Sequence, residues 1–271
     1  MDRSAVVAIV AGALQGVFEW LPISSEGNIT IFLTALGSSP QAAVQFSLFL
    51  HAGTALSATA YYRDELAEVL AALPDWRPAG AFEGDRATLS FLAVATLASG
   101  VVGMAAYATL ETVVSALTGG AFVAVIGLLL VATGLLQRVA DGFELGGRET
   151  PDLLDALLVG SLQGLAILPG VSRSGTTASA LLFRGHDGPS SFRLSFLLSI
   201  PAALGAGALV LADEGVPAVE PSAALLALGT AAVVGYLSID ALMRVVERVP
   251  FWGVCVGLGA LAVIGGGALL V

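Results

Sequence analysis

Long apolar stretches separated by short polar segments run along the whole chain. Six of these stretches reach the roughly 20 residues that a helix needs to cross a bilayer. They cover residues 41–62, 88–107, 114–137, 191–212, 222–243 and 251–271. The pattern therefore predicts six full membrane spans.

Two further apolar helices, over residues 4–21 and 153–168, are interrupted before they complete a span. Pro22 stops the first and Pro169 the second, because proline cannot continue a helix. A polar turn follows each proline, and then comes an apolar piece that is too short to cross a bilayer. Each of these segments predicts a helix hairpin that enters the membrane and returns to the side it left.

The two halves of the chain repeat this plan of hairpin, loop and three spans. Short sequence matches support an internal duplication. Leu14-Gln15-Gly16 matches Leu162-Gln163-Gly164, Leu21-Pro22 matches Leu168-Pro169, and Ser24–Asn28 matches Ser172–Thr176. We therefore predict a single membrane domain, residues 1–271. It would comprise a first repeat over 1–138, a connecting loop over 139–152 and a second repeat over 153–271.

The arginines predict how the two halves are oriented. They occur in the loops 63–87, 138–152 and 244–250, whereas the loops 108–113 and 213–221 have none. By the positive-inside rule the first three loops are cytoplasmic. The hairpins then enter from opposite faces, and their polar turns meet near the middle of the membrane. The predicted fold is an all-α polytopic membrane protein built as an inverted repeat, each half a re-entrant helix hairpin plus three transmembrane helices.

Composition agrees with a membrane protein. The chain is 56% hydrophobic and 12% charged, with a mean hydropathy of +0.90, whereas about a quarter of the residues in a soluble domain are charged. The net charge of −10 argues against a nucleic-acid surface. The single cysteine, Cys255, excludes a disulfide framework within the chain and is expected to be a small buried apolar residue.

The turn after Pro169 has the composition of a phosphate-binding loop. Over eight residues it contains two glycines, two serines, two threonines and an arginine, and it opens a helix. Arginine, hydroxyl groups and free backbone N–H groups are what proteins use to hold phosphate. The candidate binding residues are Gly170, Ser172, Arg173, Ser174, Gly175 and Thr177.

The turn after Pro22 contains carboxylates that are costly within a membrane. Glu19 and Glu26 therefore need a cation, a proton or Arg173 as partner. Glu19 is a candidate for binding a divalent metal or for acid–base chemistry, although it could instead form a structural ion pair with Arg173. Glu26 is a candidate base that could also simply reach water. Ser24, Ser25 and Asn28 complete this polar turn.

Two histidines and two glycine motifs carry weaker signals. His51 lies in the middle of a span, where it is either a satisfied core residue or a general acid or base. His186 stands beside Asp187 in a predicted loop and is expected to be solvated. Gly100-Val-Val-Gly103 and Gly265-Gly266-Gly267 predict close helix packing.

Four segments occur in order over nearly the whole chain. They are Gln15-xxx-Glu19-Trp-Leu-Pro-Ile-Ser-Ser25-x-Gly27, His51-Ala-Gly-Thr54, Pro169-Gly-Val-Ser-Arg-Ser-Gly-Thr-Thr177 and Phe196-Leu-Leu-Ser-Ile-Pro201. Together they resemble the sequence elements of a known family, the BacA-type undecaprenyl-pyrophosphate phosphatases. The resemblance implies a plasma-membrane enzyme that removes the terminal phosphate of a long polyprenyl diphosphate. It also implies re-entrant inverted repeats and an active site that opens to the outer face.

The resemblance also implies roles for individual residues. Glu19 matches the metal or acid–base glutamate, and Gln15 occupies a position where the family admits Glu or Gln and so joins Glu19 at the metal. Ser25 matches a catalytic serine. The diphosphate-binding residues match Ser172, Arg173, Ser174 and Thr177. The family's histidine after SSxG is Asn28 here, which makes Glu26 and His51 the candidate replacements.

Together these residues suggest a mechanism and leave alternatives open. Arg173 and the N–H groups of 170–175 would hold the diphosphate, with a divalent cation, Mg²⁺ or Ca²⁺, between it and Glu19. Ser25 or a water would attack, with Glu19 or Glu26 as base. The expected partners are the lipid substrate and the bilayer, with a homodimer left open and no nucleic acid. The rival interpretation is a polyprenyl-phosphate flippase with the same pocket; an anion channel is less favoured because the carboxylates would repel anions.

Overall fold

The computed structural model describes residues 3–117, 119–143, 147–213, 219–246 and 248–269. Within these ranges the chain forms helices and no strand, apart from one isolated bridge between Arg148 and His186. The first half contains α1 (Arg3–Phe18), α2 (Ser25–Ala35), α3 (Pro40–Tyr61), α4 (Arg63–Ala71), α5 (Arg86–Ala116), α6 (Gly119–Ala140) and the 3₁₀ turn η1 (Asp141–Phe143). The second half contains α7 (Leu153–Leu165), α8 (Arg173–Phe183), α9 (Gly188–Asp213), α10 (Pro221–Val246) and α11 (Phe251–Ala268).

Five helices in the described part are long and apolar enough to cross a membrane: α5, α6, α9, α10 and α11. The prediction of an all-helical, multi-pass membrane protein is therefore confirmed. The helix α3 has 22 residues, which is enough for a span, but its sequence is more polar. Ser47, Thr54 and Ser57 on this helix are buried inside the protein, so its polar groups line the interior of the bundle.

Two predicted loops are partly helical. The helix α5 continues to Ala116, so the predicted break at 108–113 is wrong. The segment 104–116 contains no glycine or proline to end the helix, and Leu110 and Val114 pack in a buried cluster with residues of α6. The predicted loop 63–87 contains α4, whose first turn has two acidic residues that favour a helix N-terminus.

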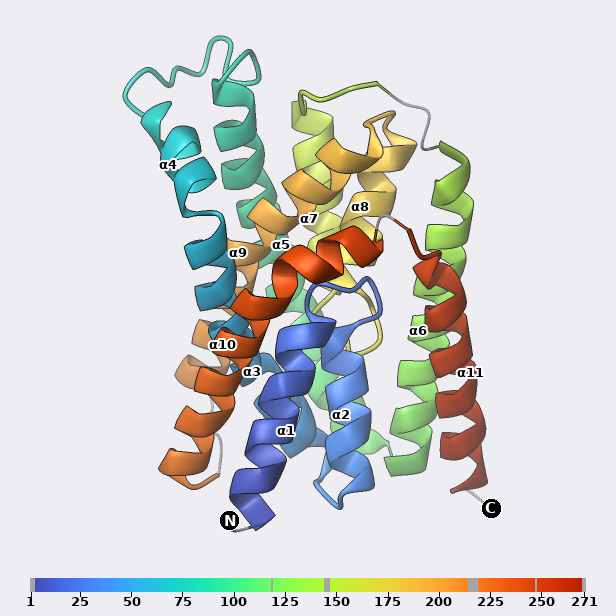
Figure 1. Ribbon diagram of the computed structural model, residues 1–271. Coiled ribbons are helices and arrows are strands. Elements are labelled where there is room, and N and C mark those ends of the chain that lie inside the picture. Colours follow the sequence, from blue (N-terminus) through green and yellow to red (C-terminus); the bar gives the residue numbers. More distant parts are fainter. Residues whose placement is uncertain (1–2, 118, 144–146, 214–218, 247, 270–271) are drawn as a thin grey trace.

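The two hairpins turn earlier than their prolines suggest. The helices α1 and α7 end at Phe18 and Leu165, and tight turns lead on to Pro22 and Pro169. Proline disfavours a helical conformation in the residue before it, which accounts for Leu21 and Leu168 but not for helix ends three residues earlier. After the second turn, α8 begins at Arg173, ahead of the expected apolar piece. In Figure 1 both turns lie at the mid-height of the bundle.

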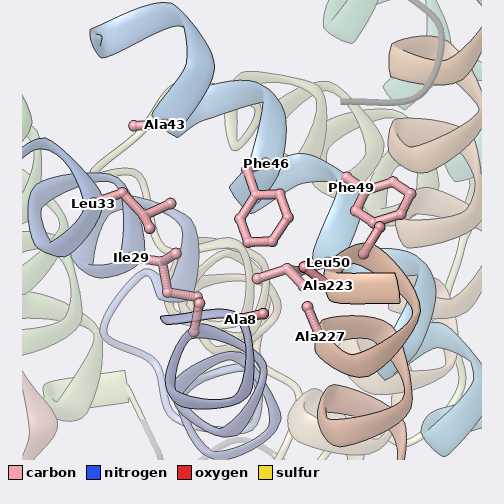
Figure 2. Close-up of a cluster of buried hydrophobic side chains, with 11 residues drawn as sticks. Ala8, Ile29, Leu33, Ala43, Phe46, Phe49, Leu50, Ala223 and Ala227 are labelled. Atoms are coloured by element: carbon pink, nitrogen blue, oxygen red, sulfur yellow. The ribbon is translucent and has the colours of Figure 1, made fainter. Parts of the chain in front are cut away.

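Helix pairs surround these turns. The helix α1 packs along α10, α7 along α5, α3 against α9, and α6 against α11. Figure 2 shows the buried cluster that holds the first hairpin, where side chains from α1, α2, α3 and α10 meet. Its largest members are Ile29 and Leu33 of α2 with Phe46, Phe49 and Leu50 of α3. Cys255 is fully buried, as predicted.

Glycines set the approach of α6 and α11. A Cβ atom on Gly127 would lie 2.5 Å from Gly259 O, and one on Gly266 would lie 2.5 Å from Gly120 O. Close packing in the triple-glycine motif is thus confirmed at Gly266 and wrong for Gly265 and Gly267, where an added Cβ atom would meet nothing within 4 Å. In the other motif the prediction is wrong for Gly100 and confirmed at Gly103, because a Cβ atom on Gly164 of α7 would lie 2.8 Å from Gly103 N.

A buried polar cluster closes the base of the second hairpin. Asp155, at the start of α7, accepts hydrogen bonds from Arg184 Nε at 2.7 Å and Arg148 Nη2 at 3.1 Å, and it contacts His186 Nε2 at 3.0 Å. Burial alone would raise the pKa of Asp155, but hydrogen bonds from His186, the backbone N–H of Asp152 and Arg184 hold that pKa well below its usual range. His186 is fully buried, so its predicted solvation is wrong: the buried carboxylate draws it inward.

The packing of α6 on α11 predicts the effect of a single methyl group. Gly127→Ala should destabilise the protein by about 1–3 kcal/mol, because the added atom meets backbone. The matched control is Gly257→Ala on α11, where the added methyl would meet open space. Thermal unfolding in detergent should show a lower Tm for the first variant alone; equal melting temperatures would contradict this packing.

Candidate active site

The N-termini of α2 and α8 meet at the centre of the protein. Ser24 caps α2 by accepting a hydrogen bond from Gly27 N at 3.2 Å, and Ser172 caps α8 by accepting one from Gly175 N at 3.2 Å. These two serines are counterparts in the sequence repeat. The first N–H groups of each helix have no intrahelical partner, so the two ends together form a site that favours an anion.

Ser24 also joins the two hairpins. Its Oγ accepts a second hydrogen bond from Gly170 N, at 3.2 Å. Ser24 has φ 61°, and it is the only non-glycine residue with positive φ in the described ranges. That conformation costs roughly 1–3 kcal/mol and persists where surrounding contacts fix it. A Cβ on Gly27 would lie 2.7 Å from Gly170 N, so the close approach of the turns requires glycine there.

The carboxylate of Glu19 lies at the centre of the site and is bound by several of its residues. Its Oε1 forms an ion pair with Arg173 Nη2. Its Oε2 accepts hydrogen bonds from Ser25 Oγ at 2.8 Å and Gln15 Nε2 at 2.9 Å. The predicted pairing of Glu19 with Arg173 is therefore present. The same carboxylate is also bonded to a serine hydroxyl, which is the geometry of a nucleophile and its base.

His51 lies beside this carboxylate. Its Nδ1 donates to the carbonyl of Ser47 at 2.9 Å, and its Nε2 lies 3.4 Å from Glu19 Oε2. The backbone bond fixes the ring orientation and turns Nε2 toward the carboxylate. His51 is thus in contact with the candidate catalytic residues rather than isolated in the apolar core. Its role as an acid or base stays a prediction.

A small polar cleft lies among these groups. It is lined by most of the predicted site residues, namely Glu19, Ser24, Ser25, Glu26, His51, Ser172, Arg173 and Ser174. Arg173 comes from α8, and its side chain is 14% exposed. The sequence therefore predicted most of the residues that the fold brings together.

Five predicted residues support the cleft from behind. The side chain of Asn28 donates to the carbonyls of Ile23 at 2.7 Å and Ser24 at 2.9 Å. Thr177 donates to Arg173 O at 2.9 Å. The N–H groups of Gly170 and Gly175 are bonded to the two capping serines, as described above. Gln15 is fully buried behind Glu19. The N–H groups left for a ligand are therefore those at the start of each helix.

A much larger cavity, with a volume of about 470 Å³, adjoins the cleft. Glu26, His51 and Arg173 line both spaces. The rest of its wall is mainly apolar and comes from α5, α9 and the end of α7. No prediction from the sequence covers this wall. A signal for it is Gly100, whose missing side chain leaves space at the cavity, whereas Gly103 of the same motif lies against Gly164 of α7.

Fold and site together define a class of protein: a multi-pass α-helical membrane protein with a buried Ser–Glu–Arg site for an anionic group. The family model described as "Bacitracin resistance protein BacA" matches residues 8–262. The chain belongs to the BacA family. Three of the four segments that resemble this family contribute residues to the cleft, and the fourth contributes Pro201 to the wall of the larger cavity.

Several relatives that match almost end to end are named undecaprenyl-diphosphatase. The protein of Haloarcula marismortui is 58% identical over 264 residues, covering 96% of this chain and 97% of its own. That of Methanococcoides burtonii is 38% identical over 263 residues, with 95% and 96% covered. A bacterial relative from Geobacter sulfurreducens is 39% identical over 248 residues, with 89% of each chain covered.

The buried ion pair predicts strong thermodynamic coupling. Glu19→Gln or Arg173→Gln alone should destabilise the protein by about 3–5 kcal/mol, because each leaves a buried charge without its partner. The double variant should be clearly more stable than the sum of the two losses implies. Denaturant or thermal unfolding in detergent measures this cycle, and additive losses would show that the pair is not coupled.

Proposed function

We propose that this protein is an integral-membrane phosphatase that hydrolyses a long-chain polyprenyl diphosphate, of the undecaprenyl type, to the monophosphate and inorganic phosphate. One observation carries the proposal: a polar cleft with Arg173, Ser25 and Glu19 opens beside an apolar cavity, so one site matches both parts of an anionic lipid. The names of its relatives support the same substrate. Such an enzyme recycles the lipid carrier for cell-envelope glycan synthesis.

The tail would bind in the cavity. The cleft beside it has a volume of only about 20 Å³, close to that of one water site, so the diphosphate would enter it by separating Arg173 from Glu19. Arg173 and the first N–H groups of α8 provide positive charge and donors for phosphate oxygens. Ser24, Ser172 and Ser174 add hydroxyl groups. A cavity of about 470 Å³ is in the range of small-ligand sites. It would therefore hold the first part of the polyprenyl chain while the rest stays in the bilayer.

The chemistry follows from the Ser25–Glu19 contact of 2.8 Å. Binding of the diphosphate draws Arg173 toward its oxygens and frees Glu19 to accept a proton. Ser25 Oγ attacks the terminal phosphorus as its proton passes to Glu19. The anhydride P–O bond breaks, and the polyprenyl monophosphate leaves. Water then hydrolyses the phosphoserine, with Glu26 or His51 available as base in place of the family's histidine.

A divalent cation, Mg²⁺ or Ca²⁺, is part of the proposal. Glu19 and Gln15 would hold it. Gln15 Oε1 is a buried oxygen with no hydrogen-bond partner in the described part of the chain, and oxygen ligands suit these cations. The described residues contain no group of three or more His, Cys, Asp or Glu that could hold a metal, so phosphate oxygens would complete the ligand set. When bound, the cation neutralises charge on the diphosphate.

We further propose that residues 1–138 and 153–271 are inverted repeats with re-entrant hairpins. The helix contacts support this: α1 packs on α10 as α7 packs on α5, and the counterpart pairs α3 with α9 and α6 with α11 pack together. The cavity extends toward Met104 and Leu209, near the ends of α5 and α9 that are far from Arg86 and Arg193. The positive-inside rule then puts its opening at the outer face of the plasma membrane.

Arg173→Ala and Ser25→Ala should each lower phosphate release from a polyprenyl diphosphate by at least about 100-fold, because one loses charge stabilisation and the other the nucleophile. The assay uses detergent-solubilised protein, in which a flippase has no two faces to connect. Ser190→Ala, remote from the cleft, serves as control. Full activity of the Arg173 variant would reject the proposed function, and binding without turnover by the wild type would favour the flippase.

Removal of divalent cations should lower phosphate release and leave the protein folded. The measurement is activity after treatment with a chelator, followed by addition of Mg²⁺ or Ca²⁺. Activity should return with the cation, because the diphosphate then regains its charge compensation. Unchanged activity in excess chelator would remove the cation from the proposal without affecting the roles of Ser25 and Arg173.

A further inference from the structure

Gln163 of α7 has no role in the proposed mechanism, yet it lines the large cavity together with Glu26, His51 and Arg173. It is the counterpart of Gln15 in the sequence repeat. Its side chain is buried, with 4% of the residue exposed. Its Nε2 donates to Ser99 Oγ of α5 at 3.3 Å, which anchors this end of the amide to α5.

The other end of this amide is unsatisfied. Gln163 Oε1 is buried and has no hydrogen-bond partner among the described residues, and the same holds for Glu26 Oε1 on the wall of the same cavity. A buried acceptor without a donor costs about 1–3 kcal/mol. Neither an isoprenoid tail nor an ionised diphosphate offers a donor. A water molecule offers two O–H donors, and polar groups of this kind are what hold water inside proteins.

The contrast with Gln15 shows why this glutamine differs from its counterpart. Gln15 Nε2 is bonded to the carboxylate of Glu19. The position that corresponds to Glu19 in the second repeat is Ile167, so Gln163 has no carboxylate to orient. Gln163 is thus a buried amide on the cavity wall that lacks a carboxylate partner such as Gln15 has in Glu19.

We propose that Gln163, anchored by Ser99, positions the water that completes the reaction, with Glu26 accepting its proton. This rests on the proposed function. The water oxygen forms a bond to phosphorus and the bond between phosphorus and Ser25 Oγ breaks. Oγ regains the proton held by Glu19, the proton of the water passes to Glu26, and inorganic phosphate leaves. Gln163 gains and loses no proton, so it is a positioning residue, as glutamines are in other phosphoryl-transfer sites.

The test is Gln163→Leu, which removes the amide at similar volume. Loss of water positioning should lower kcat by about 100-fold and lower KM in proportion, so that kcat/KM is unchanged, because only the hydrolysis of the phosphoenzyme is slowed and the cleft that binds the diphosphate is intact. Rapid-quench measurements should show a burst of polyprenyl monophosphate, slow release of inorganic phosphate, and acid-stable phosphate on Ser25. Leu157→Ile, an exposed position on the same helix as Gln163 that lines neither the cavity nor the cleft, is the apolar control and should show none of these changes.

Three outcomes are decisive. If the Gln163→Leu variant releases phosphate at the wild-type rate, the inference is overturned. It is also overturned if the variant has a raised KM and forms no phosphoenzyme, because that result indicates that Gln163 contacts the substrate. Ser99→Ala, which loosens the amide, should give a smaller effect of the same kind, and it carries the test if the leucine variant does not fold. Absence of phosphate release by the wild type in this assay would instead reject the proposed function.

Discussion

The ion pair between Glu19 and Arg173 is the interaction on which the site depends. Each charge would be expensive alone at this depth, and each comes from a different hairpin. The pair therefore couples the two halves of the molecule, because each hairpin buries a charge whose partner comes from the other hairpin. Ser24 reinforces the coupling, because its hydroxyl caps one helix and also binds the backbone of the opposite turn. The strain at Ser24 is tolerated for the same reason.

The same pair explains how a site of this kind can be both stable and reactive. In a low-dielectric environment, hydrogen bonds and charges act more strongly than in water. An anionic ligand competes with Glu19 for Arg173, so binding itself would release the carboxylate that is bonded to Ser25. The paired form of Glu19 and Arg173 would thus be the stable state of the empty site, and the form separated by a ligand would be the reactive state. A ligand must therefore carry enough negative charge to replace the Glu19 carboxylate beside Arg173.

The two hairpins contribute different groups to the site. The first has the carboxylates and Ser25; the second has Arg173, and Ile167 stands where the first has Glu19. The second is also clamped at its base by Asp155, Arg148, Arg184 and His186. In the proposed function the second hairpin would bind the substrate and the first would perform the chemistry. Gln15 and Gln163 stand at matching positions of the two hairpins and contact different groups.

The sequence alone determined the helical membrane class, the two broken helices and most of the cleft, because apolar length, proline and costly intramembrane charges are local signals. Predictions from the sequence were wrong for residues whose surroundings depend on contacts between distant segments. His186 was expected in solvent, yet Asp155, 31 residues away, draws it inside. Gly100 predicted tight packing, but it lines a cavity whose other wall is α9. Only the tertiary structure decided that Asn28, Gly170 and Thr177 support the cleft from behind while Gln163 faces the cavity, because side-chain direction depends on how the two hairpins meet.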